Sequence, residues 1–385
     1  MCSSHSLGRG NLCVVFLLAV AALFATAGPA AAGRSAQTFA YITNTGSGSV
    51  SVIDTSDYSN DNPVVQTTLP LWPSGGTSPF GVGVPPVINR DNLYEPHRAY
   101  VSNRDRDGTM SVIESIPGPN PVYDPWSHRV VATVAVPGCS FPRGIAAHPD
   151  GTRVFLACSD ANVVVMSTIS LTWMANIPLY GEPKASLPYG IHVTPGGKKV
   201  YVTDQVQSNL IVINANNYSV TERKDLPRGS DGHNLLPEGV HVDPRGRTVW
   251  VAYSGSHPGD IGVSVYRVSD ESLVGHVRFD DDAQPASVYA RSRRVGYVTL
   301  YGSGELAEVR VYPSSTRIRR TPVGSSPQGL TADRYRNVYV ANNGGHSVTA
   351  VFDIFRGVSS TLGVGQSPTA FGEFMAPRKC SSCTM

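Results

Sequence analysis

The sequence has few charged residues and no long apolar stretch after its N-terminal region. Asp, Glu, Lys and Arg make up 16% of the 385 residues, and the formal net charge is +2. The 31 basic residues are scattered along the chain and form no stripe, which argues against a nucleic-acid-binding surface. No later segment has the roughly 20 apolar residues that a transmembrane helix needs, so we expect no membrane span in the mature chain.

Glycine and proline are abundant where charge is scarce. The chain contains 38 glycines and 29 prolines, and 41% of its residues are hydrophobic. This composition is typical of a folded protein built from many short strands joined by tight turns.

The N-terminal region has the order of a secretory signal peptide. Arg9 precedes an apolar run at residues 12–27, and the small-residue stretch GPAAAG follows at residues 28–33. An A-x-A pattern lies at residues 30–32, so residues 1–32 are predicted to be removed on export. The apolar run is too short for a membrane anchor, and no cysteine follows it where a lipoprotein signal would need one. We expect a free mature protein that is secreted or periplasmic.

Similar strand-like runs recur along the rest of the chain. There are seven: AYITN (40–44), AYVSN (99–103), VFLAC (154–158), VYVTD (200–204), VWVAY (249–253), GYVTL (296–300) and VYVAN (338–342). Most are followed, after a short turn of Gly, Ser or Asn, by a second apolar run. Each such pair is predicted to form a β-hairpin.

A third element begins at a proline and precedes every one of these runs except the first. The anchor prolines are spaced by 41 to 63 residues, and they are Pro79, Pro142, Pro188, Pro237, Pro285, Pro327 and Pro368. Periods in the forties with four strands per unit indicate the blades of a β-propeller.

The two ends of the chain are predicted to complete one blade together. The chain begins with the second, third and fourth strands of a blade and ends with a lone first strand, TAFGEF, at residues 369–374. We expect this strand to pair with residues 38–44, which closes the ring and removes free sheet edges. The prediction is an all-β, seven-bladed propeller of four-stranded antiparallel blades at residues 33–376, followed by a tail at residues 377–385.

Three segments resemble the YVTN β-propeller repeat: YITNTGSGSVSVIDT, PYGIHVTPGGKKVYVTD and SPQGLTADRYRNVYVANN. The resemblance covers nearly all of the mature chain and implies the propeller fold. It implies little about function, because similar propellers include surface-layer proteins, lactonases, streptogramin lyases and the haem d1 domain of nitrite reductase. The last class is disfavoured, since its partner cytochrome motif C-x-x-C-H is absent.

The residue after each anchor proline should lie at the rim of the central channel, on the face where propellers usually bind ligands. Around the ring this series is Phe80, Arg143, Tyr189, Glu238, Ala286, Gln328 and Thr369. It places Arg143, Tyr189 and Glu238 on successive blades, where they are candidates to hold a small polar or anionic ligand. The alternative is that exposed rim positions vary without a function.

Two histidines and a tyrosine occupy equivalent positions four residues after the anchor prolines of adjacent blades. They are His192, His241 and Tyr289, and strand alternation places them opposite the apolar face of the strand. Two imidazoles there could bind a metal ion or act as acid and base. The spacing indicates no third ligand, and the alternative is that the pair lines the channel or packs between blades.

A turn after the second run partly matches the EF-hand calcium loop. Asn103, Asp105 and Asp107 form N-x-D-x-D-G with the next glycine, and Glu114 is at the twelfth position. Residues 109–114 are a predicted strand that carries Glu114 away, so only a looser calcium site at Asn103, Asp105 and Asp107 is a candidate. The alternative is an ordinary solvated polar turn.

The mature chain keeps four of the six cysteines. Cys139 and Cys158 are predicted to form a disulfide, because they lie at the same face of one blade in an exported protein. Cys380 and Cys383 form C-S-S-C in the polar tail, where a local disulfide or an unstructured end is expected.

The first blade carries two insertions, at residues 85–97 and 116–127. Both are expected on the face opposite the candidate ligand site. Their aromatic residues Tyr94, Tyr123 and Trp126 are candidates for a partner-binding surface or for a cap on the channel.

Two functions compete. The first is a monomeric, non-enzymatic propeller that binds a small ligand or an envelope or extracellular protein, because no nucleophile, base and orienting group can be assembled. The second is a lactonase or lyase at the channel mouth, with His192 or His241 as base and Arg143 or a metal ion as electrophile. No cofactor is required by the sequence, and a divalent metal ion such as calcium is the candidate.

Overall fold

The structure is a computed structural model. It describes residues 38–55, 63–71, 78–85, 97–119, 126–181, 185–226, 235–255, 260–312, 315–333, 336–354 and 357–376. These all belong to one compact unit, Ser35–Met385. The predicted signal peptide, the C-S-S-C tail, Tyr94 and Tyr123 lie outside the described residues.

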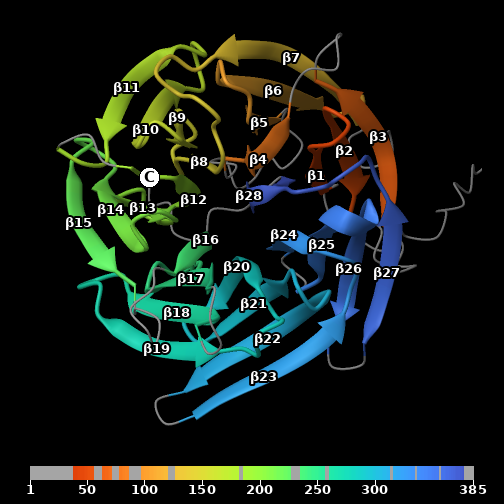
Figure 1. The fold of residues 1–385 in the computed structure, drawn as a ribbon. Coiled ribbons are helices and arrows are strands. Elements are labelled where there is room, and N and C mark those ends of the chain that lie inside the picture. The colour runs from red at the N-terminus through yellow and green to blue at the C-terminus, as the bar shows by residue number, and fades with distance from the viewer. Residues whose placement is uncertain are drawn as a thin grey trace, which may run out of the picture. The chain divides into compact units, whose positions relative to one another are not determined.

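Seven antiparallel sheets form a ring, which confirms the predicted all-β seven-bladed propeller (Figure 1). Within the described ranges the only helical element is the 3₁₀ turn η1 (Asn343–Gly345). No helix in this part of the chain has the length and apolar character that crossing a membrane requires.

The first three blades follow one another along the chain. Blade 1 contains β4 (Pro79–Gly83), β5 (His97–Asn103), β6 (Thr109–Ile116) and β7 (Ser127–Ala135). Blade 2 contains β8 (Ile145–Ala147), β9 (Arg153–Cys158), β10 (Asn162–Ser167) and β11 (Trp173–Pro178). Blade 3 contains β12 (Pro188–Val193), β13 (Lys199–Asp204), β14 (Asn209–Asn214) and β15 (Val220–Asp225).

The next three blades repeat the same order. Blade 4 contains β16 (Leu236–Val242), β17 (Thr248–Ser254), β18 (Gly262–Arg267) and β19 (Leu273–Arg278). Blade 5 contains β20 (Pro285–Ser292), β21 (Val295–Leu300), β22 (Glu305–Tyr312) and β23 (Ser315–Pro322). Blade 6 contains β24 (Pro327–Ala332), β25 (Val338–Asn342), β26 (Ser347–Asp353) and β27 (Val358–Gly363).

Both ends of the unit contribute to blade 7, as predicted, but the strand that pairs with β1 lies at residues 375–376 and not at the predicted residues 369–374. It contains β1 (Phe39–Asn44), β2 (Ser49–Asp54), β3 (Val64–Pro70) and β29 (Met375–Ala376), which pairs with β1. Asn44 also forms a bridge with Pro368. Between these two points the chain leaves β1, and β28 (Phe371–Glu373) pairs in parallel with β4 of blade 1. Figure 1 shows β28 near the centre of the ring.

The hydrophobic core lies between neighbouring blades. Trp250 and Val263 of blade 4, for example, belong to one buried cluster with Val288 and Val298 of blade 5. The second strands are buried on both faces, which explains their runs of β-branched and aromatic residues. Full burial of such a side chain contributes about 1.5–3 kcal/mol.

Hydroxyl side chains on second strands join neighbouring blades. Thr43 donates to the carbonyl oxygen of Phe80 at 2.8 Å, and Thr203 donates to the carbonyl oxygen of Glu238 at 2.8 Å. The Thr203 hydroxyl also accepts the N–H of Gly190 in its own blade at 2.8 Å. These threonines therefore fix the position of the residue that follows the anchor proline of the next blade.

The glycine two residues after the anchor proline lets neighbouring first strands approach closely. A Cβ atom on Gly81 would lie 2.7 Å from the carbonyl oxygen of Arg143, closer than real Cβ atoms come. A narrow channel therefore requires glycine at this position in most blades.

The asparagine that ends several second strands stabilises the following turn. Asn342 Nδ2 donates to Ser347 Oγ at 3.1 Å and to Thr349 Oγ1 at 2.9 Å. Asn44 and Asn103 form the equivalent pairs of hydrogen bonds in their own blades.

A chain of hydrogen bonds connects blade 7 to blade 1. Gln66 Oε1 can only accept, so His128 Nε2 donates to it at 2.8 Å, and His128 Nδ1 accepts from Ser115 at 2.7 Å. Ser115 Oγ in turn accepts from Tyr41, whose oxygen accepts from His97 Nε2 at 2.9 Å. This order of donors and acceptors requires a neutral His128, because its Nδ1 accepts.

Candidate functional site

A cavity of 520 Å³ lies at one mouth of the channel. Its walls come from the loops between second and third strands and from the starts of first strands, as the position of the anchor prolines in the repeat predicts. Five of the seven rim residues in the predicted series line it: Phe80, Glu238, Ala286, Gln328 and Thr369. Arg104 and Tyr301 from the loops complete its polar wall.

The predicted candidates Arg143, Tyr189 and Glu238 lie together next to this cavity. The guanidinium of Arg143 lies over the ring of Tyr189, at 4.8 Å from its centroid, and the two side chains form a hydrogen bond. Burial lowers the pKa of Arg143, while the nearby Tyr189 and Glu238 act in the opposite direction. Arg104 lies over the ring of Phe80 at 4.8 Å.

Glu238 is the acidic group of the mouth. Burial raises the pKa of Glu238 to about 7, although the charge of Arg143 and a hydrogen bond with Gln205 partly offset this effect. Near neutral pH its carboxyl group therefore exists in both protonation states, and it can donate or accept a proton.

Three aromatic rings form a layer beneath the mouth. Phe80 stacks on Phe371 with ring centroids 5.1 Å apart, and Tyr189 meets both edge-on at 5.5 and 5.3 Å. Phe80 lines the mouth cavity, whereas Phe371 lines a second, much smaller cavity of 10 Å³ deeper in the channel. The aromatic layer therefore lies between the two cavities.

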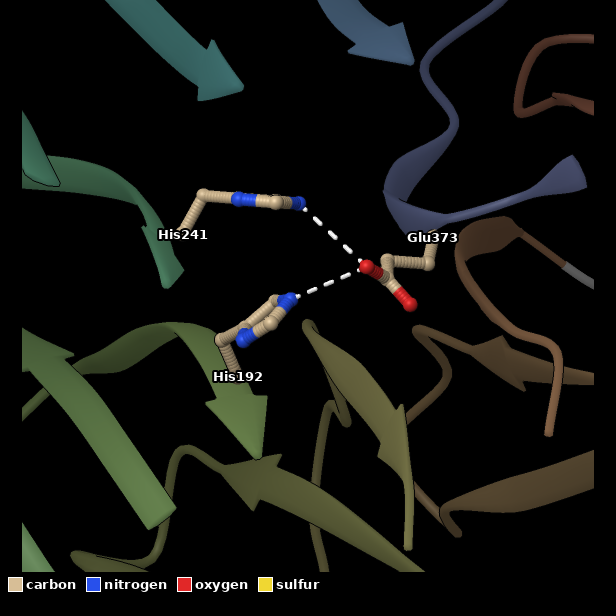
Figure 2. Close-up of side chains that lie close together, drawn as sticks. All are labelled: His192, His241 and Glu373. Carbon is tan, nitrogen blue, oxygen red and sulfur yellow. Dashed lines mark hydrogen bonds and ion pairs between the residues drawn. The ribbon is translucent and has the colours of Figure 1, made fainter. Parts of the chain in front are cut away.

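His192 and His241 meet on the inner side of this layer, together with Glu373 (Figure 2). The two imidazole centroids are 4.3 Å apart. Glu373 Oε1 lies 3.2 Å from His192 Nε2 and 3.3 Å from His241 Nε2. Both imidazoles are more than nine-tenths buried, with side-chain exposures of 7%.

Neighbouring groups orient the ring of His241. Tyr289, the third residue of the predicted series, lies on β20 of the next blade, and its ring contacts that of His241 in a tilted arrangement with centroids 4.4 Å apart. The backbone N–H of Ala290 donates to His241 Nδ1 at 3.2 Å. In the neutral imidazole the proton is therefore on Nε2, where it faces Glu373.

Glu373 was not among the predicted site residues. Its position in the repeat held a usable signal, because the residue five after the anchor proline is Val or Ala in the other six blades: Val84, Ala147, Val193, Val242, Ala290 and Ala332. A single carboxylate among six small apolar residues indicates a different role for the last first strand. The parallel pairing of β28 with β4 gives this carboxylate its place in the channel.

The predicted calcium turn uses its residues differently. Asn103 is fully buried, and its Nδ2 donates to Ser111 Oγ at 2.8 Å. Asp105 accepts a backbone N–H, Asp107 is exposed, and Glu114 forms salt bridges with two arginine side chains. A calcium site at Asn103, Asp105 and Asp107 stays a prediction.

The structure joins Cys139 and Cys158 in a disulfide, with a Cα–Cα distance of 5.1 Å. Both are buried in the core cluster between blades 1 and 2. Cys139 lies in the segment that enters blade 2, four residues before Arg143. The bridge links it to Cys158 at the end of β9.

Trp126 does not form an exposed partner surface. Only 3% of this residue is exposed, and its ring packs on Phe39 with centroids 5.5 Å apart. Burial of so large an aromatic ring between blades 7 and 1 is more favourable than its exposure to solvent. The hypothesis that Trp126 belongs to a partner-binding surface is therefore wrong.

The sequence matches no family model and no curated protein. Solved structures share its fold at low identity. A protein from Lactobacillus plantarum is 16% identical, with a TM-score of 0.65, and the match covers 87% of this chain and 98% of that chain. A putative 6-phosphogluconolactonase from Bacteroides uniformis is 13% identical, with a TM-score of 0.64 and coverage of 87% and 98%. The periplasmic gluconolactonase PpgL of Pseudomonas aeruginosa is 16% identical, with a TM-score of 0.62 and coverage of 86% and 98%.

Proposed function

We propose that the protein is an exported propeller that binds a small, negatively charged polar molecule in the mouth cavity. The observation that carries this proposal is the charge of the mouth. Arg104 lines the cavity and Arg143 lies beside it, next to Glu238, which has the only carboxyl group among the described lining residues. Since the pKa of Glu238 is about 7, the two cations exceed the negative charge near neutral pH.

Arg143 provides the main physical reason for an anion. Its guanidinium is partly removed from water, and its Nε atom is buried with no hydrogen-bond partner among the described residues. A buried donor without an acceptor costs about 1–3 kcal/mol, more when it is charged. A carboxylate or phosphate group would offset that cost, because hydrogen bonds between ionised partners are roughly twice as strong as neutral ones.

The size and lining of the cavity indicate a small molecule. A volume of 520 Å³ lies within the range of about 300–1,000 Å³ that is usual for small-molecule sites. The rim supplies Gln328 and Thr369 as neutral hydrogen-bonding groups, and the ring of Phe80 provides an apolar surface. A polar sugar acid combines the features that this lining can recognise.

Isothermal titration calorimetry of the mature protein with gluconate and 6-phosphogluconate tests the proposal. Arg104→Ala and Arg143→Ala should each weaken binding by about tenfold or more, the effect of losing one charge-assisted hydrogen bond. Arg106→Ala removes an exposed arginine two residues from Arg104 and is the matched control. Undiminished binding by both cavity variants, or no binding of either anion, would contradict the proposal.

Lactone hydrolysis is a second candidate function, favoured by Glu238. A carboxylate with a pKa of about 7 next to an arginine can remove a proton from water while the guanidinium stabilises the oxyanion formed on the lactone carbonyl. The ring ester bond then breaks, and the alkoxide takes the proton. Two of the similar structures bear the names of lactonases, which makes gluconolactone and 6-phosphogluconolactone the substrates to test.

A pH-stat assay separates the two candidates. Hydrolysis should increase as the pH rises through about 7, because only the ionised Glu238 acts as a base. Glu238→Gln should abolish hydrolysis while the product anion still binds. Absence of turnover in the wild type, with binding intact, leaves the binding function alone.

Export is part of the proposed function. A disulfide persists in oxidising compartments and is rare in the reducing cytosol, so the Cys139–Cys158 bridge agrees with the predicted signal peptide. Detection of the processed chain in a periplasmic or culture-medium fraction tests this assignment, and unprocessed protein confined to the cytoplasm would refute it.

A further inference from the structure

We propose that His192, His241 and Glu373 form a binding site for a divalent transition-metal ion, deep in the channel and separate from the mouth cavity. Figure 2 shows the three side chains pointing toward one another from β12, β16 and β28. They come from blades 3 and 4 and from the chain segment that closes the ring.

The distance from the carboxylate oxygen to each imidazole nitrogen matches that between two ligands of one ion. Ligand bonds from zinc to His nitrogen and to carboxylate oxygen are about 2.0–2.2 Å, which places the ligands of a tetrahedral site about 3.3 Å from one another. Glu373 Oε1 lies 3.2 and 3.3 Å from the two Nε2 atoms. The three donor atoms all lie within 4.8 Å of one another. Small side-chain movements would therefore suffice to coordinate an ion.

The donor set defines the class of metal. Two imidazole nitrogens and one carboxylate oxygen suit zinc and other first-row transition ions, whereas calcium and magnesium prefer oxygen ligands alone. The channel site therefore differs in chemistry from the oxygen-rich turn at Asp105 and Asp107. It also leaves a fourth position for solvent, and the adjoining 10 Å³ cavity, lined in part by His241, has about the volume of one water molecule.

The surroundings hold the two rings in position before any ion binds. The ring of His241 lies between those of His192 and Tyr289, with centroid distances of 4.3 and 4.4 Å and interplanar angles of 46° and 42°. Both histidines lie on short first strands that are paired with buried second strands. Little side-chain entropy remains to be lost on coordination, which favours binding.

The hydrogen bond from Ala290 to His241 Nδ1 opposes coordination. It places the ring proton of the neutral imidazole on Nε2. An ion at Nε2 requires that proton to be on Nδ1 instead, which can then no longer accept from Ala290, so this hydrogen bond would be lost. Loss of one buried hydrogen bond lowers affinity by about 10- to 100-fold. Structural zinc sites have association constants of about 10⁷ M⁻¹ or more, so the cost reduces the affinity of the site without abolishing it.

Cobalt binding to the mature, untagged protein tests the proposal. We expect one Co²⁺ per chain by calorimetry, visible d–d absorption typical of four or five ligands, and a higher melting temperature with Zn²⁺. Glu373→Gln keeps an oxygen that accepts hydrogen bonds from imidazole but removes the anionic ligand, and it should weaken Co²⁺ binding by more than about 100-fold. His241→Ala should have an effect at least as large.

Control variants exclude binding elsewhere. His148→Ala removes another buried histidine, and the double change of Cys380 and Cys383 to Ser removes the tail thiols. Both controls should keep one ion per chain. The proposal is overturned if the wild type binds no Co²⁺ or Zn²⁺, or if Glu373→Gln, with an unchanged circular dichroism spectrum, binds as tightly as the wild type. Anion binding at the mouth is measured in separate titrations, so either result stands independently of the proposed function.

Discussion

Acidification below pH 6.5 is expected to weaken the contact between blades 7 and 1. His97 and His128 take part in the hydrogen-bond chain there as neutral imidazoles, one as a donor to Tyr41 and the other as an acceptor from Ser115. Burial lowers the pKa of His97 to about 3, with a smaller contribution from His128, and burial lowers the pKa of His128 to about 4. Both pKa values lie well below the value of about 6.5 that a histidine has in the unfolded chain.

The sign and size of the effect follow from these pKa values. Above pH 6.5 neither state binds the proton and the stability is unaffected, whereas between pH 6.5 and about 4 only the unfolded chain binds it. The free energy of unfolding then falls by about 1.4 kcal/mol per pH unit for each histidine. From pH 6.5 to 4.5 the loss is about 2.5 kcal/mol for each, or about 5 kcal/mol for both. That is a large fraction of the usual stability of a protein, about 5–15 kcal/mol.

Urea denaturation at several pH values, followed by tryptophan fluorescence, measures this loss. Trp126 lies 5.2 Å from the His97 ring and reports on the contact directly. His128→Gln should be less stable at pH 7 but should lose about 1.4 kcal/mol less per pH unit on acidification. His346→Gln, at an exposed position, controls for the loss of a histidine as such. Equal pH slopes for the wild type and His128→Gln would refute the reasoning.

Three further predictions concern the fold. Replacing Cys139 and Cys158 by Ser should lower the free energy of unfolding by about 3 kcal/mol, because the bridge spans 19 residues; two alkylatable thiols at these positions in the unreduced, denatured wild type would exclude it. Deleting the chain from Thr369 onward should expose the inner edge of β1 and cause aggregation or a marked fall in melting temperature, and an unchanged melting curve would contradict the closure. Thr203→Val should cost about 1–3 kcal/mol in chemical denaturation, because it leaves the Glu238 carbonyl and the Gly190 N–H without their buried partner; a stability equal to the wild type would show that these bonds contribute nothing.

The blades could be predicted from the sequence because each repeats the same local requirements. An anchor proline begins a first strand, a glycine two residues later allows close approach, and a Thr or Ser on the second strand bonds to the next blade. Gly81 and Thr203 illustrate these requirements. Rim residues could be predicted for the same reason, since the repeat fixes which position faces the mouth while the residue type varies.

The repeat marks Glu373 as an unusual residue but does not place its carboxylate next to the two histidines. His192 and His241 occupy equivalent repeat positions and therefore meet, but Glu373 lies one residue further along its strand. It reaches them only because β28 leaves β1 and pairs with β4. A departure from the repeat depends on long-range pairing, which the local pattern does not encode. Asn103 of the predicted calcium turn, by contrast, obeys the repeat, because its Nδ2 bonds to Ser111 of its own blade.

The C-terminal segment at residues 369–373 contributes to the mouth cavity, to the aromatic layer and to the histidine site. Thr369 lines the mouth cavity, Phe371 belongs to the aromatic layer, and Glu373 contacts the two histidines. These contacts depend on the docking of the C-terminal end against β1 and β4, because the partners come from blades that are distant in the sequence. Both candidate sites are therefore complete only when the ring is closed. Since an ion at Glu373 would tie this segment to blades 3 and 4, metal binding should raise the melting temperature by stabilising the closed ring, and by mass action the gain should increase with ion concentration.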